Sequence, residues 1–92
     1  MDDLFPTTVE AVVRLLQTMV PDNEQTKIAA MSEDDLVNLD LSLGLWIRNS
    51  LGFYEGNTQL LRDSGEENPD DASFTIIHAF WQQLRRGLPQ VH

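Results

Sequence analysis

Apolar residues recur in this sequence at intervals of three and four, and the runs that they form stop at proline or glycine. Such spacing places apolar side chains along one side of an α-helix, and these two residue types commonly end helices. The stops fall at Pro21, Gly52, Gly65 and Gly87. No run alternates apolar and polar residues over a length sufficient for a strand. The sequence therefore predicts an all-α fold, a compact array of four to five helices.

Residues suited to begin helices stand before these runs. Thr7, with Glu10 three residues later, predicts a capping box at the start of the first helix. Ser32, Asn57 and Asn68 have side chains that accept hydrogen bonds from the free amides of a first turn. They predict the N-caps of three later helices.

The stretch 22–31 allows two interpretations. Asp22 and Gln25 are placed to cap a short helix that runs through Ile28 and Met31. A tight loop would explain the same residues, and the sequence leaves both open.

The longest apolar run, residues 33–51, is apolar around most of its circumference. One side comprises Leu36, Leu39, Leu43, Trp46, Ile47 and Leu51, and the apolar surface is widened by Val37, Leu41 and Leu45. A helix with so little polar surface is usually buried on most sides. We therefore expect helix 33–51 at the centre of the array, with Gly52 as its left-handed C-terminal cap.

The length of the chain favours one domain. A chain of 92 residues supports a single hydrophobic core, and the absence of cysteine leaves helix packing as the source of stability. We expect one helical domain over residues 1–92. Its tail, 88–92, follows the last stop signal and is expected to fray.

Charge restricts the partners that this chain can bind. Fifteen acidic residues against six basic ones give a net charge of −9, which repels nucleic-acid phosphates and anionic lipid surfaces. We expect a cationic protein partner, without direct nucleic-acid binding or membrane association. No apolar stretch approaches the roughly 20 residues of a membrane span, and the first residues do not resemble a signal peptide. The sequence therefore predicts a cytoplasmic protein.

Several short motifs resemble those of a known family. They are Ser-Glu-Asp-Asp-Leu at 32–36, Ser-Leu-Gly-Leu-Trp-Ile-Arg-Asn at 42–49, Gly-Asn at 56–57, Pro-Asp-Asp-Ala-Ser at 69–73, and Trp81. Together they resemble a family of small bacterial proteins known only as a domain of unknown function. The resemblance implies an all-helical fold and a bacterial or phage setting, and it implies no activity.

Motifs that would carry catalysis or hold a cofactor are missing from the sequence. His78 has no second ligand at helical spacing, and no hydrolase, phosphate-loop or calcium-loop pattern occurs. The acidic pairs Asp34–Asp35 and Asp70–Asp71 both stand at predicted helix starts, where the helix dipole favours anions. We therefore expect no enzyme activity, no cofactor and no metal.

A polar row crosses the apolar helix 33–51. Asp40, Gly44 and Arg48 lie four residues apart, and Gly44 would let another element approach closely. Arg48 has two interpretations, a structural ion pair with Asp70 or Asp71 and an arginine that holds a ligand. The candidate polar site comprises Asp40, Arg48, Asn49, Asn57, Asp70 and Asp71.

One edge of the predicted helix 69–86 carries aromatic and basic residues, the types that dominate interface energetics. The edge comprises Phe74, His78, Trp81 and Arg85. Either helix 57–65 or the loop at Phe53 and Tyr54 covers this edge, or the edge is exposed and binds a protein together with that loop.

These features favour a non-enzymatic, acidic, protein-binding module. An immunity protein or a phage-encoded inhibitor that blocks a partner's surface, including a basic groove for nucleic acid, would have this size and charge. The alternative is a small-molecule-binding or catalytic domain with a polar site around Arg48, Asn49 and Asn57. A third hypothesis is a homodimer formed through helix 69–86.

Overall fold

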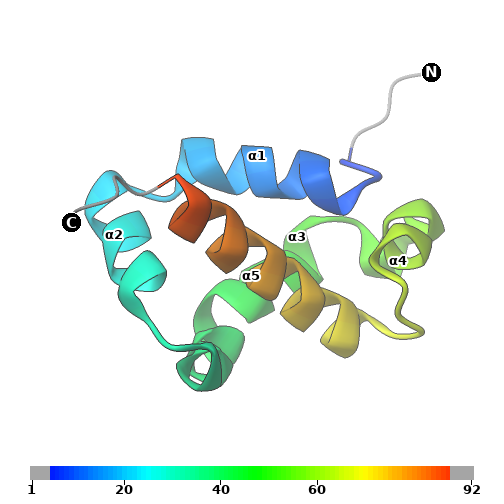
Figure 1. Ribbon diagram of the computed structural model, residues 1–92. Helices are drawn as coiled ribbons and strands as arrows, with labels where there is room; N and C mark the ends of the chain where they lie inside the picture. Colours follow the sequence, from blue (N-terminus) through cyan, green and yellow to red (C-terminus); the bar gives the residue numbers. More distant parts are fainter. Residues whose placement is uncertain (1–4, 88–92) are drawn as a thin grey trace.

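The computed structural model describes residues 5–87 as an assembly of helices (Figure 1). The α-helices are α1 (Val9–Met19), α2 (Asp22–Ala30), α3 (Leu45–Ser50), α4 (Thr58–Ser64) and α5 (Pro69–Arg86). No strand occurs within residues 5–87, and the predicted all-α class is confirmed. The tail 88–92, for which fraying was predicted, lies outside the described residues.

The centre of the array is α5 rather than the segment 33–51. Helix α5 contacts α1, α2, α3 and α4, and it also contacts the residues that precede α3 (Figure 1). Its apolar face is buried along its length, at Ala72, Ile76, Ile77, Phe80 and Leu84. The segment 33–51 lies at the periphery of the array, because it buries one apolar side and exposes the other to solvent.

The segment 33–50 is helical throughout but changes its winding twice. A 3₁₀-helix, η1 (Glu33–Leu39), leads into a π-helical stretch, η2 (Asp40–Gly44), and then into α3. A 3₁₀-helix is wound more tightly than an α-helix and a π-helix more loosely, so the two departures offset each other. Leu36 and Ile47 therefore still face the same core, as the expected α-helical spacing requires.

Thr8, not Thr7, caps α1, so the predicted capping box is wrong by one residue. The backbone of Thr8 is extended, and its hydroxyl accepts a hydrogen bond from the amide of Ala11. The amide of Val9 donates instead to Asp63 Oδ2 of α4, at 2.7 Å. A carboxylate from a distant element thus satisfies an amide that the helix start would leave free.

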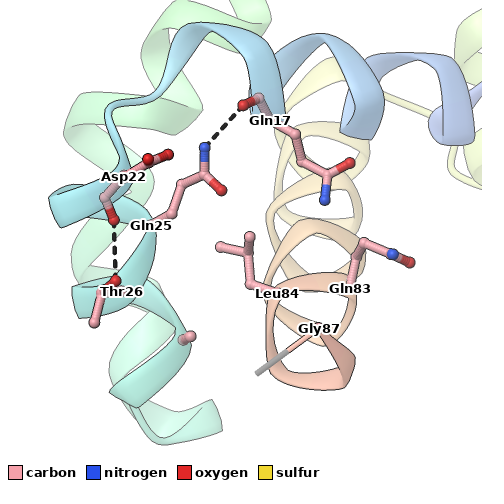
Figure 2. A pocket seen from close by; sticks show the side chains of 8 residues that line it. Gln17, Asp22, Gln25, Thr26, Gln83, Leu84 and Gly87 are labelled. Atoms are coloured by element: carbon pink, nitrogen blue, oxygen red, sulfur yellow. Dashed lines mark hydrogen bonds between the residues drawn. The ribbon is translucent and has the colours of Figure 1, made fainter. Parts of the chain in front are cut away.

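Gln25 caps the end of α1 rather than the start of α2. Its side-chain amide donates to the carbonyl oxygens of Gln17 (2.9 Å, Figure 2) and Val20 (2.7 Å). The N-cap of α2 is Pro21, which makes no side-chain cap. The helical interpretation of residues 22–31 is confirmed, and the loop interpretation is wrong.

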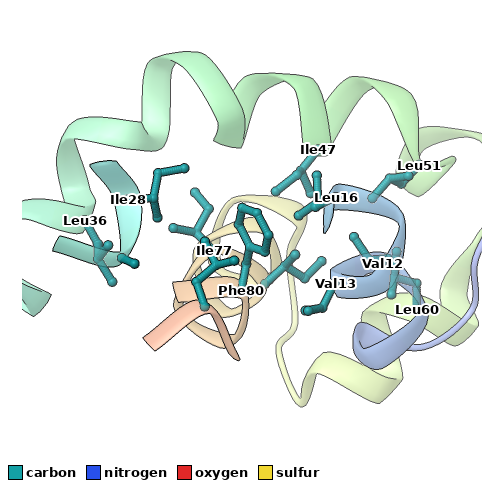
Figure 3. Packing of buried hydrophobic residues seen from close by; sticks show 13 residues of the cluster. Val12, Val13, Leu16, Ile28, Leu36, Ile47, Leu51, Leu60, Ile77 and Phe80 are labelled. Atoms are coloured by element: carbon teal, nitrogen blue, oxygen red, sulfur yellow. The ribbon is translucent and has the colours of Figure 1, made fainter. Parts of the chain in front are cut away.

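A single cluster of buried apolar side chains joins the helices (Figure 3). It comprises Val12, Val13, Leu16, Ile28, Ala29, Leu36, Ile47, Leu51, Leu60, Ile76, Ile77, Phe80 and Leu84. The close-up shows the ring of Phe80 from α5 with residues of the other elements around it. The helices are therefore held together by one shared core.

The turn after α3 depends on Gly52 and Asn57. Gly52 has φ +80°, and a Cβ there would lie 2.5 Å from the ring of Phe5, so only glycine fits. The side-chain amide of Asn57 donates to the carbonyl oxygens of Pro6 (2.9 Å) and Leu51 (2.7 Å). The side-chain oxygen of Asn57 also caps α4. One side chain thus joins the segment before α1 to the α3–α4 turn.

We expect Asn57→Ala to lower the free energy of unfolding by about 1–2 kcal/mol, because a helix cap and two hydrogen bonds to carbonyl groups are lost together. Denaturation by urea, followed by circular dichroism, measures the change. Asn49→Ala is the matched control, since Asn49 is exposed and its truncation should stay within about 0.5 kcal/mol of the wild type. Equal effects of the two substitutions would contradict the structural role of Asn57.

Candidate functional site

The guanidinium group of Arg48 lies in a cluster of oxygen atoms between η2 and α5. Its Nη1 donates to Asp40 Oδ1 at 2.9 Å and to Ser73 Oγ at 3.1 Å, and its Nη2 donates to the Asp40 carbonyl oxygen at 3.2 Å. Its Nε lies 3.5 Å from Asp70 Oδ1. The Arg48 side chain is only 11% exposed. Every nitrogen of this guanidinium group therefore has a partner within the protein.

The backbone at Gly44 lies close to Arg48, Asp40 and α5. A Cβ at Gly44 would lie 3.1 Å from both Arg48 Nη1 and Asp40 Oδ1, and 3.4 Å from Ile77 Cδ1 of α5. The predicted close approach at Gly44 is thus found, with α5 as the approaching element. The arrangement is that of an ion pair that fastens η2 to α5.

The structure brings together only three residues of the predicted polar site, which are Asp40, Arg48 and Asp70. Asp71 instead pairs with Asn68 at the start of α5. Asn49 is exposed, and Asn57 is bonded to the chain before α1 and to the end of α3. The six residues do not converge on one place where a ligand would bind.

The aromatic edge of α5 is joined to the chain around the end of α2. Trp81 Nε1 donates to the Met31 carbonyl oxygen at 2.9 Å, and Arg85 Nη1 donates to the Ala29 carbonyl oxygen at 3.1 Å. The Arg85 guanidinium also stacks over the Trp81 ring, 5.0 Å from its centroid. Two residues of this edge therefore serve to hold α2 against α5.

His78, the next residue along this edge, also interacts with another element. Its Nε2 lies 2.6 Å from Glu33 Oε2 at the start of η1. Phe74, at the other end of the edge, is 37% exposed. The covering element is thus the α2–η1 connection, where the sequence predicted α4 or the loop at Phe53 and Tyr54. Arg85 is also exposed, so this edge of α5 is covered only in part.

The loop residues Phe53 and Tyr54 differ in their exposure to solvent. They lie in a short 3₁₀-turn, η3 (Phe53–Glu55), which contacts α3 and α4. Phe53 packs against the core, whereas Tyr54 is 63% exposed. The two residues therefore do not extend the edge of α5 into a continuous docking face.

The most exposed apolar surface lies on the segment 33–50. Val37 is 61% exposed, Leu41 83% and Leu45 47%, and the three stand four residues apart on the outer side of that segment. We call these three residues the outer aliphatic strip. They are half of the six large apolar side chains that are exposed among the described residues. Scattered single residues of this kind are ordinary, but three in helical register form a patch.

Polar and acidic residues border the outer aliphatic strip. Asp34, Asp35, Asn38, Ser42 and Asn49 are all exposed on the same segment. Residues 33–50 contain four acidic side chains and one cation, and that cation is the ion-paired Arg48. The outer side of this segment is thus apolar along its middle and negative at its N-terminal end.

The apolar spacing of residues 33–51 predicts that Val37, Leu41 and Leu45 widen the buried surface, and this prediction is wrong. A peripheral helix buries only one side, and here that side carries Leu36 and Ile47. One available signal was the position of the polar residues, which lie beside Val37, Leu41 and Leu45 in sequence. A sector bordered in this way on both sides is typical of a solvent-facing surface.

A cavity of about 260 Å³ lies where α2 and the end of α5 meet the end of α1 (Figure 2). It is lined by Gln17, Asp22, Gln25, Thr26, Ala29, Gln83, Leu84 and Gly87. Two of its polar side chains are already used, Gln25 in capping α1 and Thr26 in a 3.0 Å hydrogen bond to the Asp22 carbonyl oxygen. The cavity is smaller than the roughly 300 Å³ at which ligand pockets usually begin.

Within residues 5–87, no helix is both long and apolar enough to cross a membrane. The same part of the chain contains no group of three or more histidine, aspartate or glutamate side chains arranged to hold a metal ion. The acidic pairs noted in the sequence lie at the starts of η1 and α5, where their carboxylates meet the positive end of the helix dipole.

Comparison with known proteins gives one family. No curated protein and no solved structure matches this sequence. A family model described as "Domain of unknown function (DUF6794)" matches residues 5–84, which include every helix of the structure up to the last turn of α5. The chain therefore belongs to the DUF6794 family, whose function is unknown.

Proposed function

We propose that this domain is a non-enzymatic protein-binding module that docks its partner on the outer aliphatic strip. The observation that carries the proposal is the exposure of Val37, Leu41 and Leu45 in one helical row. Each square ångström of apolar surface removed from water contributes about 25 cal/mol, so a partner that covers the row gains affinity directly. The fold itself does not use these side chains, because the core cluster is complete without them.

The charge of the domain supports a protein partner of opposite sign. The net charge of −9 favours encounter with cationic surfaces and disfavours nucleic acid. An immunity protein or an inhibitor that occupies a basic groove of an enzyme acts in this way. This mode of action needs only a surface and no catalytic group.

The buried polar groups of the described residues are engaged within the fold. Among the described residues, no buried side-chain nitrogen or oxygen lacks a hydrogen-bond partner. Arg48, the most deeply placed cation, is neutralised by Asp40 and Asp70. The buried polar side chains therefore act within the fold, and the proposal rests on the outer surface.

We expect Leu41→Gln to reduce partner binding at least about tenfold while leaving the free energy of unfolding within about 0.5 kcal/mol, because Leu41 is a contact residue that the core does not use. The measurement is affinity capture from cells of the source organism, with wild type and variant loaded at equal amounts. Met19→Gln is the matched control, since Met19 is an exposed apolar residue (48%) on α1. It should capture the partner as the wild type does.

Two results of this experiment would count against the proposal. Wild-type protein that recovers no stoichiometric partner would argue against a protein-binding module. A partner that is recovered equally with Leu41→Gln would argue against the outer aliphatic strip as its docking surface.

A further inference from the structure

We infer that the occupant of the outer aliphatic strip is an amphipathic helix of a partner protein, with lysine or arginine beside its apolar stripe. This inference rests on the proposed function and names the chemistry of the partner. It follows from the shape of the strip and from the charges at its border.

The strip has the dimensions of a helix-packing surface. Val37, Leu41 and Leu45 follow one another at four-residue spacing through η1, η2 and the start of α3, so they form a ridge of roughly two helical turns. A ridge of this kind fits the groove between rows of side chains on a second helix. Two to three turns of a partner helix, with apolar residues at positions i, i+3 or i+4, and i+7, would cover it.

Leu41 is the centre of this surface. It is the most exposed of the three, at 83%, and has Val37 and Leu45 one turn away on either side. Binding energy concentrates at central apolar side chains that become fully desolvated, while their neighbours exclude water. The loss of Leu41 should therefore weaken binding more than the loss of either neighbour.

The charges that border the strip specify a cationic partner helix. Asp34 and Asp35 are exposed near its N-terminal end, whereas Asp40, beside its middle, is paired with Arg48. Arg48 does not counter Asp34 and Asp35, because its side chain is 11% exposed and is paired with Asp40 and Asp70. Lysine or arginine on the flanks of the partner's stripe would meet these carboxylates, and acidic residues there would be repelled.

Other occupants fit the same surface less well. Nucleic acid and anionic lipid surfaces are repelled by the acidic border and by the net charge. A second copy of this chain carries the same net charge of −9, so its approach is opposed by like charge. The cationic helix is the occupant that satisfies both the apolar ridge and its border.

The test uses the whole chain and a designed peptide of about 18 residues, with leucine along one helical face and lysine elsewhere. Two control peptides have glutamate in place of lysine, or the same composition with the leucines dispersed around the helix. Fluorescence anisotropy measures affinity at about 50 mM and about 200 mM salt. Amide chemical shifts of the labelled protein report where the peptide binds.

We expect the leucine–lysine peptide to bind and the other two to bind at least about tenfold more weakly. Leu41→Gln should weaken binding about tenfold or more, and Met19→Gln should change it less than about twofold. The double variant Asp34→Asn/Asp35→Asn should weaken binding about threefold at low salt and less at higher salt. Shift changes should centre on residues 37–45.

Several outcomes would overturn the inference. These are tight binding of the glutamate peptide, equal binding to Leu41→Gln, shift changes confined to other elements, and a Leu41-dependent dimer in sedimentation. If a natural partner is captured through Leu41 but the lysine peptide does not bind, the proposed function stands and the cationic helix is the wrong partner. If neither is observed, both proposals are overturned.

Discussion

Replacing Phe80 with alanine should lower the free energy of unfolding by about 3–5 kcal/mol, the largest change expected for a single side chain in this domain. Phe80 is fully buried on α5, within the one cluster to which all the main helices contribute. Its removal leaves a cavity at the centre of the array, and the surrounding side chains belong to different helices, which cannot all close over it. The free energy of unfolding of a small domain is about 5–15 kcal/mol, so a loss of this size should leave the variant marginally stable.

Urea denaturation, followed by circular dichroism and by tryptophan fluorescence, measures this loss. Phe74→Ala is the matched control, because Phe74 lies on the same helix but is 37% exposed. It should cost about 1 kcal/mol or less, since less apolar surface returns to water. Similar losses for the two variants would contradict the central place of Phe80.

The helix boundaries were largely predictable because local chemistry determines them. Asn68 and Pro69 begin α5, with the Asn68 side chain accepting from the amide of Asp71 at 2.9 Å. Gly52 and Gly65 both adopt the left-handed conformation expected after a helix. These signals act within a few residues, so one sequence is enough to interpret them.

Interactions between distant residues were not predictable in the same way. Besides the local cap from Thr8, α1 is capped by Asp63 of α4 and Gln25 of α2. Nothing near Val9 in the sequence indicates which carboxylate will reach its amide. The changes of winding within residues 33–50 likewise depend on how that segment packs against α5.

In the candidate sites, too, local spacing was predictable and contacts between distant elements were not. The spacing of Asp40 and Arg48 predicted that they share one side of a helix. The partner predicted for Arg48 was Asp70 or Asp71, but Asp40 lies closer to the guanidinium group, at 2.9 Å against 3.5 Å for Asp70. Which apolar side of that helix faces water depends on where α5 lies, and in the sequence only the neighbouring polar residues indicate it. The outer aliphatic strip was therefore assigned to the core, although its three residues were recognised as apolar.

The second large effect is expected at Arg48, where replacement by methionine should lower the free energy of unfolding by about 2–3 kcal/mol. Methionine keeps much of the buried stem but removes the bonds to the Asp40 side chain, the Asp40 carbonyl oxygen and Ser73 Oγ. It also leaves the carboxylates of Asp40 and Asp70 without the cation between them. The loss should be smaller than for a fully buried pair, because the Asp40 side chain is 42% exposed and that of Asp70 is 81% exposed.

A set of variants separates a structural Arg48 from one that holds a ligand. Arg48→Lys should recover only part of the stability, since an ammonium group cannot reach Asp40 and Ser73 in the geometry of the guanidinium fork. Asp70→Asn should change stability by about 0.5 kcal/mol or less, because that contact is 3.5 Å long and exposed. In a double-mutant cycle, Arg48→Met and Asp40→Asn should couple by about 1 kcal/mol or more. An arginine kept for a ligand would behave in the opposite way, because its replacement relieves an unfavourable burial of charge; unchanged or increased stability of Arg48→Met would therefore restore the ligand-site hypothesis.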